Sequence, residues 1–124
     1  MRDTRLVTQH RGGLLTPAQH KQLMKWAYTC AEHVLPFLNT TLDDRLTNAL
    51  QIAKQWEKGN VTVGDAIKAS RDVHTFARES SDVLTIAIAR SIGHAVATAH
   101  MADHALGAAI YALKAILCVG KSVD

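Results

Sequence analysis

Residues 83–117, VLTIAIARSIGHAVATAHMADHALGAAIYALKAIL, form the stretch around which the rest of this chain must pack. Ala, Ile, Leu, Val and Gly occupy nearly every helical face of this stretch, and a helix that is apolar all round belongs in the middle of a fold. The polar exceptions are Arg90, His94, Thr98, His100, Asp103, His104, Tyr111 and Lys114. The sequence therefore predicts a helical core built on residues 83–117.

The length of this core stretch predicts two helices rather than one. A single helix over residues 83–117 would be ~53 Å long, whereas a compact domain of this size is only ~35 Å across. We expect the break near residues 99–103, where His and Asp collect, with residues 91–93 as the alternative. Gly93 and Gly107 each cost ~1 kcal/mol of helix propensity relative to alanine. Close packing of a neighbouring helix is the expected reason for both.

Five polar side chains of the core stretch are spaced at helical intervals, and we predict that they form one buried polar network. They are Arg90, His94, His100, Asp103 and His104. Arg90 requires a partner, because an unpaired charge in an apolar helix would destabilise the fold. Glu32 or His33 of the first helix are further candidate members. Removing Asp103 from such a buried network is expected to cost ~3 kcal/mol or more.

A metal site on His100 and His104 is the alternative interpretation of these residues. The two imidazoles are one helical turn apart, which lets both bind one ion. The span reads HMADH, however, and lacks the glutamate of an HExxH zinc motif. The chain also has no Glu-x-x-His pair of the kind found in di-iron bundles. We therefore predict no bound metal and no cofactor.

Start and stop signals predict two helices before the middle of the chain. Thr16 supplies an N-cap hydroxyl followed by a proline, which opens the first helix. Pro36 ends or kinks that helix, because proline lacks an N–H and its ring clashes with the preceding turn. Thr41 is expected to cap a second helix over residues 42–58, which Gly59 stops.

A third helix is expected from Thr62 to about residue 79, with Asp65 completing a capping box. Residues 80–82 then end it and cap the core stretch. The predicted fold class is all-α, a single-domain bundle of about five helices around the central apolar stretch. We expect a polar N-terminal arm at residues 1–13 and one helical-bundle domain at residues 14–124.

Composition and charge exclude several classes of function. The net charge of +3 is too small to indicate a nucleic-acid-binding protein by itself. The first residues lack the apolar run of a secretory signal, and charged residues divide the core stretch into runs shorter than a membrane span. No nucleophile elbow, oxyanion loop or phosphate-binding glycine motif is present. We expect a cytoplasmic protein that is not an enzyme.

Several segments carry a family resemblance. They are WA at residues 26–27, CAEHVLP at residues 30–36, DR at residues 44–45 with Ala49, Ala53, Trp56 and Gly59 after it, and above all GHAVATAHMADHALGAA at residues 93–109. Together they resemble a family of small, all-helical bacterial proteins called putative immunity proteins. The resemblance implies a protein that binds and neutralises a cognate toxin of an interbacterial competition system, and so protects the producing cell.

Cations outside the core stretch are the side chains that we expect to contact such a toxin. They are Arg11, Lys21, Lys25, Arg45 and Lys54. Complementary charge speeds association and fixes register, so the basic chain predicts a toxin surface that is neutral or acidic. Two other classes remain open: a structural or metal-binding bundle that uses His100 and His104, and a weak nucleic-acid binder that uses the N-terminal cations. Homo-oligomerisation also remains open.

Overall fold

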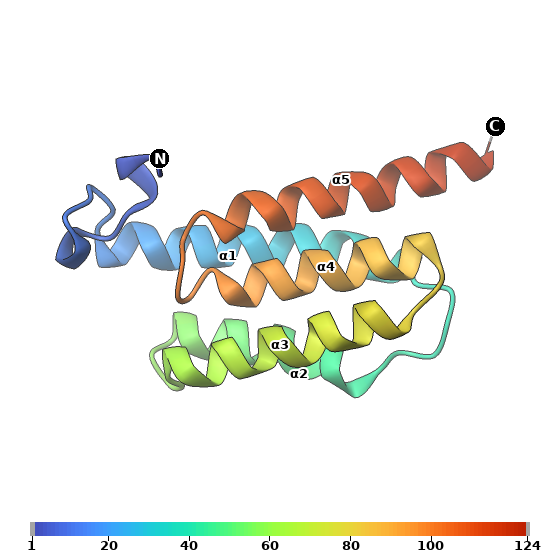
Figure 1. Ribbon diagram of the computed structural model, residues 1–124, viewed down its shortest axis with the longest axis horizontal. Helices are drawn as coiled ribbons and strands as arrows, with labels where there is room; N and C mark the ends of the chain where they lie inside the picture. Colours follow the sequence, from blue (N-terminus) through green and yellow to red (C-terminus); the bar gives the residue numbers. More distant parts are fainter. Residues whose placement is uncertain (1, 124) are drawn as a thin grey trace.

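The computed structural model describes the backbone of residues 2–123 and the side chains of residues 2–120. This part of the chain contains five α-helices. The helices are α1 Pro17–Val34, α2 Asp44–Glu57, α3 Val63–Glu79, α4 Val83–Ala97 and α5 His104–Val123 (Figure 1). Three short 3₁₀ helices accompany them, η1 Thr4–Leu6, η2 Gln9–Arg11 and η3 Leu35–Phe37. The predicted all-α bundle of five helices is confirmed. The ends of the predicted arm and domain, Met1 and Asp124, lie outside the described residues.

Helix α4 lies at the centre of the bundle and packs against all four other helices. Figure 1 shows it between α5 and the pair formed by α2 and α3. Ile88, Ile92 and Val96 are completely buried along α4. The apolar character of residues 83–97 therefore follows from contact with neighbours on several sides.

The predicted break in the core stretch is confirmed at residues 98–103, between α4 and α5. The alternative position is wrong, because Gly93 lies inside the regular helix α4. The Nε2–H group of His20 in α1 donates a hydrogen bond of 2.6 Å to the carbonyl oxygen of Thr98. A carbonyl at the end of a helix has no partner within that helix. Helix α1 thus satisfies the end of α4 and holds the turn.

Side-chain caps fix the starts of three helices as the sequence predicts. The Thr16 hydroxyl accepts the backbone N–H of Gln19 at the start of α1, and the Gln19 side-chain oxygen accepts the backbone N–H of Thr16. Thr62 and Asp65 form the same pair of bonds at the start of α3. Asp82 accepts the backbone N–H of Thr85 at the start of α4. Each cap satisfies backbone donors that the first helical turn leaves free.

Helix α2 begins at Asp44 rather than at residue 42, because Asp43 and not Thr41 caps it. The carboxylate of Asp43 accepts the backbone N–H of Arg45 at 2.8 Å and also pairs with the Arg45 guanidinium at 3.0 Å. A carboxylate is favoured at a helix N-terminus by the helix dipole as well as by the hydrogen bond. The ion pair with Arg45 adds to this preference, and the predicted Thr41 cap was wrong.

Helix α5 is buried on one face only, which corrects the prediction that residues 83–117 are enclosed on nearly every face. Its inner face consists of alanines packed on α1 and α4; these are Ala105, Ala108, Ala112 and Ala115. Its outer face exposes large aliphatic side chains; these are Leu106, Ile110, Leu113, Ile116 and Leu117.

None of the helices in the described part of the chain is long and apolar enough to cross a membrane.

The residues before α1 fold back on themselves. Backbone hydrogen bonds join Leu14 to Thr4 and Leu15 to Val7, and the Leu15 side chain is buried. Arg2 reaches the turn between α4 and α5, where it pairs with Asp103. The boundary between arm and domain at residues 13 and 14 stays a prediction.

Candidate functional site

Four imidazoles from different parts of the chain line up inside the bundle. We call His74, His94, His104 and His100 the histidine chain. His74 is on α3, His94 on α4 and His104 on α5, and His100 lies in the turn before α5. The ring centroids of successive members are 5.3, 5.1 and 5.2 Å apart. The histidine chain therefore connects three helices, and all four members are partly buried.

Two of these rings fit between the helices because each faces a glycine. A Cβ atom added at Gly93 would lie 2.6 Å from Cε1 of His74, and one added at Gly107 would lie 2.8 Å from Cγ of His94. Both distances are shorter than real Cβ contacts. The expectation that these glycines serve close packing is confirmed, and side-chain rings are the groups that fill the space.

Arg90 finds its partner in a neutral imidazole. Its Nη1 lies 2.6 Å from Nδ1 of His74, and a guanidinium only donates hydrogen bonds. Nδ1 of His74 must therefore accept, so the ring carries its proton on Nε2. Protonating Nδ1 would remove this hydrogen bond and place two positive charges in contact.

His94 and His104 share a second imidazole hydrogen bond. Their Nδ1 atoms are 2.9 Å apart, so one ring donates while the other accepts. The ring of Tyr111 stacks on His94 at a centroid distance of 5.4 Å and an interplanar angle of 10°. This bond requires at least one of the two rings to be neutral.

Burial keeps the histidine chain uncharged at neutral pH. Burial lowers the pKa of His74 to about 4, and the positive charge of Arg90 lowers it further. Burial is also the main cause that lowers the pKa of His94, His100 and His104, with neighbouring imidazoles adding to the shift at His94 and His100. Desolvation disfavours the charged form of an imidazole. At pH 7 the histidine chain is therefore a neutral network with Arg90 at one end.

The predicted network residues fall into two groups in the structure. His94, His100 and His104 lie together, and Arg90 reaches them through His74. The sequence places His74 on the core side of its helix but does not show that it meets Arg90. Asp103 points elsewhere, because its carboxylate receives two bonds from Arg2 at 3.1 and 3.2 Å.

The two candidate members from the first helix lie apart from this network. Glu32 pairs with Lys54 at 2.6 Å, and His33 is exposed. Nδ1 of His100 is buried and has no hydrogen-bond partner among the described residues. His100 thus ends the histidine chain on the side away from Arg90.

The exposure of the Arg2–Asp103 pair changes the expected effect of removing Asp103. Its side chains are 35% and 30% exposed, and a partly exposed ion pair contributes ~0–1 kcal/mol. Asp103→Ala should therefore reduce the free energy of unfolding by less than ~1 kcal/mol, instead of the ~3 kcal/mol expected for a buried network. Urea unfolding of Asp103→Ala, Arg2→Ala and the double variant measures the coupling. A loss of ~3 kcal/mol would show that Asp103 also compensates a buried charge.

His100 and His104 are neighbours, as a metal site would require. Within the described residues, however, no group of three or more His, Cys, Asp or Glu side chains is arranged to hold a metal ion. A surface pocket of about 180 Å³ opens beside His104 and is lined by His94, Met101, Asp103, His104 and Gly107. The hydrogen bond between His94 and His104 already occupies the nitrogen atoms that face each other.

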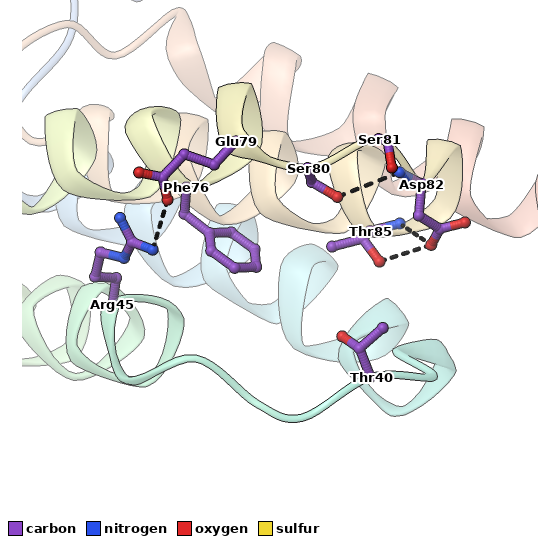
Figure 2. A pocket seen from close by; sticks show the side chains of 8 residues that line it. All are labelled: Thr40, Arg45, Phe76, Glu79, Ser80, Ser81, Asp82 and Thr85. Carbon is purple, nitrogen blue, oxygen red and sulfur yellow. Dashed lines mark hydrogen bonds and ion pairs between the residues drawn. The ribbon is translucent and has the colours of Figure 1, made fainter.

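A pocket of about 370 Å³ lies where α2, α3 and α4 meet (Figure 2). The Arg45 guanidinium lies over the Phe76 ring at 5.2 Å and pairs with Glu79 at 2.9 Å. The Thr85 hydroxyl and backbone N–H both donate to the Asp82 carboxylate. Helix caps and ion pairs within the chain thus engage these polar groups, so the pocket mainly reflects how the three helices are joined.

The five predicted partner-binding cations are distributed over two surroundings. Arg11, Lys21 and Lys25 are exposed on η2 and α1. Arg45 is bound by Asp43 and Glu79, and Lys54 is bound by Glu32. The charges of Arg45 and Lys54 are therefore already balanced within the chain, which leaves the first three as the more available cations.

One comparison with known proteins identifies a relationship. A family model described as "Imm-5 like putative immunity protein" matches residues 13–124. No curated protein and no solved structure shows significant similarity to the chain. The match includes all five helices and every member of the histidine chain.

Proposed function

Because the chain belongs to the Imm-5 like putative immunity protein family, we propose that it binds and neutralises a cognate bacterial toxin without catalysing a reaction. The observation that carries this proposal is the family match over residues 13–124. The complex would form in the cytoplasm of the producing cell, before the toxin can act there. Neutralisation would follow from covering the toxin's active surface.

The interior supports binding through the outer surface rather than through an internal site. Arg90, His74, His94 and His104 bond to one another within the bundle. A toxin that contacted them directly would have to break these bonds and separate helices. Exposed side chains on the outside of the bundle would instead form the contact.

Arg11, Lys21 and Lys25 are the best candidates for toxin contacts among the predicted cations. All three are exposed, and none of them takes part in an ion pair between described side chains. Lys21 and Lys25 are one turn apart on α1, so their ammonium groups project from the same face. A neutral or acidic toxin surface would complement this face.

The test uses the protein encoded next to the gene of this chain as the candidate toxin. Co-expression of this chain should restore growth to cells that express the toxin, and the purified proteins should form a complex. Lys21→Glu/Lys25→Glu should weaken binding by ~10–100-fold, because reversing charge at an interface replaces attraction with repulsion. Titration calorimetry at low and moderate salt measures the change.

Lys58→Glu/Arg78→Glu is the matched control, since it reverses two exposed cations away from α1, one directly after α2 and one on α3. It should bind as tightly as the unmodified chain. Absence of both growth protection and a complex would contradict the proposed function. Equal binding by the two double variants would contradict only the proposed contact face on α1.

A further inference from the structure

Helix α5 carries an exposed aliphatic surface that the bundle does not use. We call Leu106, Ile110, Leu113, Ile116 and Leu117 the α5 stripe. These five side chains are 50%, 53%, 55%, 41% and 54% exposed. Figure 1 shows α5 at one edge of the bundle, with α1 and α4 on its inner side. The stripe lies on the opposite side, as the buried alanines of the inner face show.

The distribution of side-chain size on α5 is the reverse of that expected for a helix packed only on its own domain. Alanines face the core, and leucines and isoleucines face outward. A single exposed leucine is ordinary, but a contiguous stripe over three helical turns indicates an interaction surface. We infer that the α5 stripe pairs with the α5 stripe of a second copy of this chain, in an antiparallel dimer with two-fold symmetry.

The spacing of the stripe fits such a helix pair. Residues 106, 110, 113 and 117 alternate steps of four and three, which is the a/d pattern of a coiled-coil seam. In an antiparallel pair, Leu106 of one copy meets Leu117 of the other, and Ile110 meets Leu113. A two-fold axis uses the same patch on both copies, so one self-complementary stripe is sufficient.

Charge favours a second copy over a charged partner and favours the antiparallel arrangement. The described part of α5 carries one charged residue beside the stripe, Lys114, and its Nζ lies 4.6 Å from the Tyr111 ring centroid of its own helix. The stripe therefore has little charge that could attract or orient a charged partner. A parallel pair would place the two Lys114 ammonium groups at the same level, whereas an antiparallel pair separates them along the axis.

The area of the stripe sets the expected affinity. Five half-exposed aliphatic side chains provide on the order of 300 Å² of apolar surface per copy. A standard interface buries ~800 Å² per partner, of which somewhat more than half is apolar. The stripe therefore supplies the apolar centre of a small interface. We expect a reversible dimer with a micromolar dissociation constant rather than an obligate one.

Sedimentation equilibrium of the full chain over a concentration series tests the dimer. The unmodified chain should shift from monomer to dimer between low micromolar and millimolar concentration. Ile110→Lys/Leu113→Lys should raise the dissociation constant at least tenfold, with unchanged helical circular dichroism because both positions are exposed. Leu14→Lys/Leu42→Lys adds the same charge at two exposed hydrophobic positions outside α5 and should dimerise like the unmodified chain.

A charge-swap experiment tests the orientation. Leu106→Glu/Leu117→Lys places opposite charges against each other in an antiparallel dimer, so the double variant should dimerise more tightly than either single variant at low salt. In a parallel dimer like charges would meet, and the double variant would be the weakest of the three. That result would overturn the antiparallel arrangement.

Two results would overturn the dimer itself. The first is an unmodified chain that stays monomeric at millimolar concentration, including one that instead binds vesicles of phosphatidylglycerol and phosphatidylcholine through the stripe. The second is a dimer that Ile110→Lys/Leu113→Lys leaves unchanged while the protein remains folded.

Discussion

Lowering the pH from 7 to 5 is expected to destabilise the folded chain, with a contribution of about 2 kcal/mol from His74. The pKa of His74 falls from 6.5 to about 4 on folding, because the ring is buried and faces Arg90. The unfolded chain therefore takes up a proton at His74 before the folded chain does. Stability is fully present above about pH 6.5 and is lost as the pH falls from there toward about 4.

The other imidazoles of the histidine chain act in the same direction. Burial lowers the pKa of His94, His100 and His104, so each binds protons more readily in the unfolded chain. The lowered pKa values of the capping carboxylates of Asp43, Asp65 and Asp82 affect stability at lower pH, as the pH falls through the ordinary carboxyl range near 4. The window from pH 7 to pH 5 therefore reports mainly on the imidazoles.

Urea unfolding at several pH values measures this dependence. His74→Asn keeps an oxygen acceptor near the position of Nδ1 but cannot be protonated in this range, so its stability should depend less steeply on pH. His33→Asn is the matched control, because His33 is exposed on α1. It should keep the steep dependence of the unmodified chain. Parallel curves for His74→Asn and the unmodified chain would contradict the role of His74.

Gly93→Ala and Gly107→Ala should each reduce the free energy of unfolding by about 1–3 kcal/mol, although alanine is the better helix former. Helix propensity alone would stabilise each variant by about 1 kcal/mol. The new methyl group would, however, lie 2.6 Å from the His74 ring or 2.8 Å from the His94 ring. Both rings are held by hydrogen bonds, so moving them also disturbs the histidine chain.

Gly120→Ala provides a control for the same substitution in the same kind of element. Gly120 is on α5, and a Cβ atom there would meet nothing within 4 Å. This variant should therefore be neutral or slightly more stable in urea or thermal unfolding. The double variant Gly93→Ala/His74→Ala should lose less stability than the two single losses combined, since the clash disappears with the ring. Stabilisation by Gly93→Ala would show that α3 moves aside at little cost.

Local signals in the sequence account for the helices and most of their boundaries. Thr16 with Gln19, and Thr62 with Asp65, act within one helical turn, so their caps can be predicted from spacing alone. Pro36 likewise ends α1 through the geometry of its own ring, and it lies within the 3₁₀ helix η3 that follows α1 directly. The start of α2, predicted at residue 42 and observed at Asp44, also depends on residues within one helical turn. Thr41 was the predicted cap there, but Asp43 lies only two residues further on, and its ion pair with Arg45 favours it as the cap.

Hydrogen bonds and ion pairs between residues far apart in the sequence were harder to predict than the helices. Asp103 pairs with Arg2 across 101 positions of sequence, and Arg90 pairs with His74 on another helix. Periodicity shows which side of a helix a residue is on, but it does not show which side chain faces it after docking. Three predicted network residues, His94, His100 and His104, therefore lie together, while Asp103 has another partner and His74 of α3 was not among the predicted members.

The amino-acid pattern alone was enough for the all-α class and the close packing at Gly93 and Gly107, because caps, breakers and side-chain volume act over one or two helical turns. The length of the core stretch required a break, but the pattern left its position open between residues 99–103 and residues 91–93. Which faces of the helices are buried was decided only by how the helices pack against one another. A helix that is apolar all round has several faces that a neighbour can cover, and hydrophobicity does not rank them. On α5 the neighbours covered the alanines, since small side chains allow α1 and α4 to approach closely, and this left the α5 stripe in solvent.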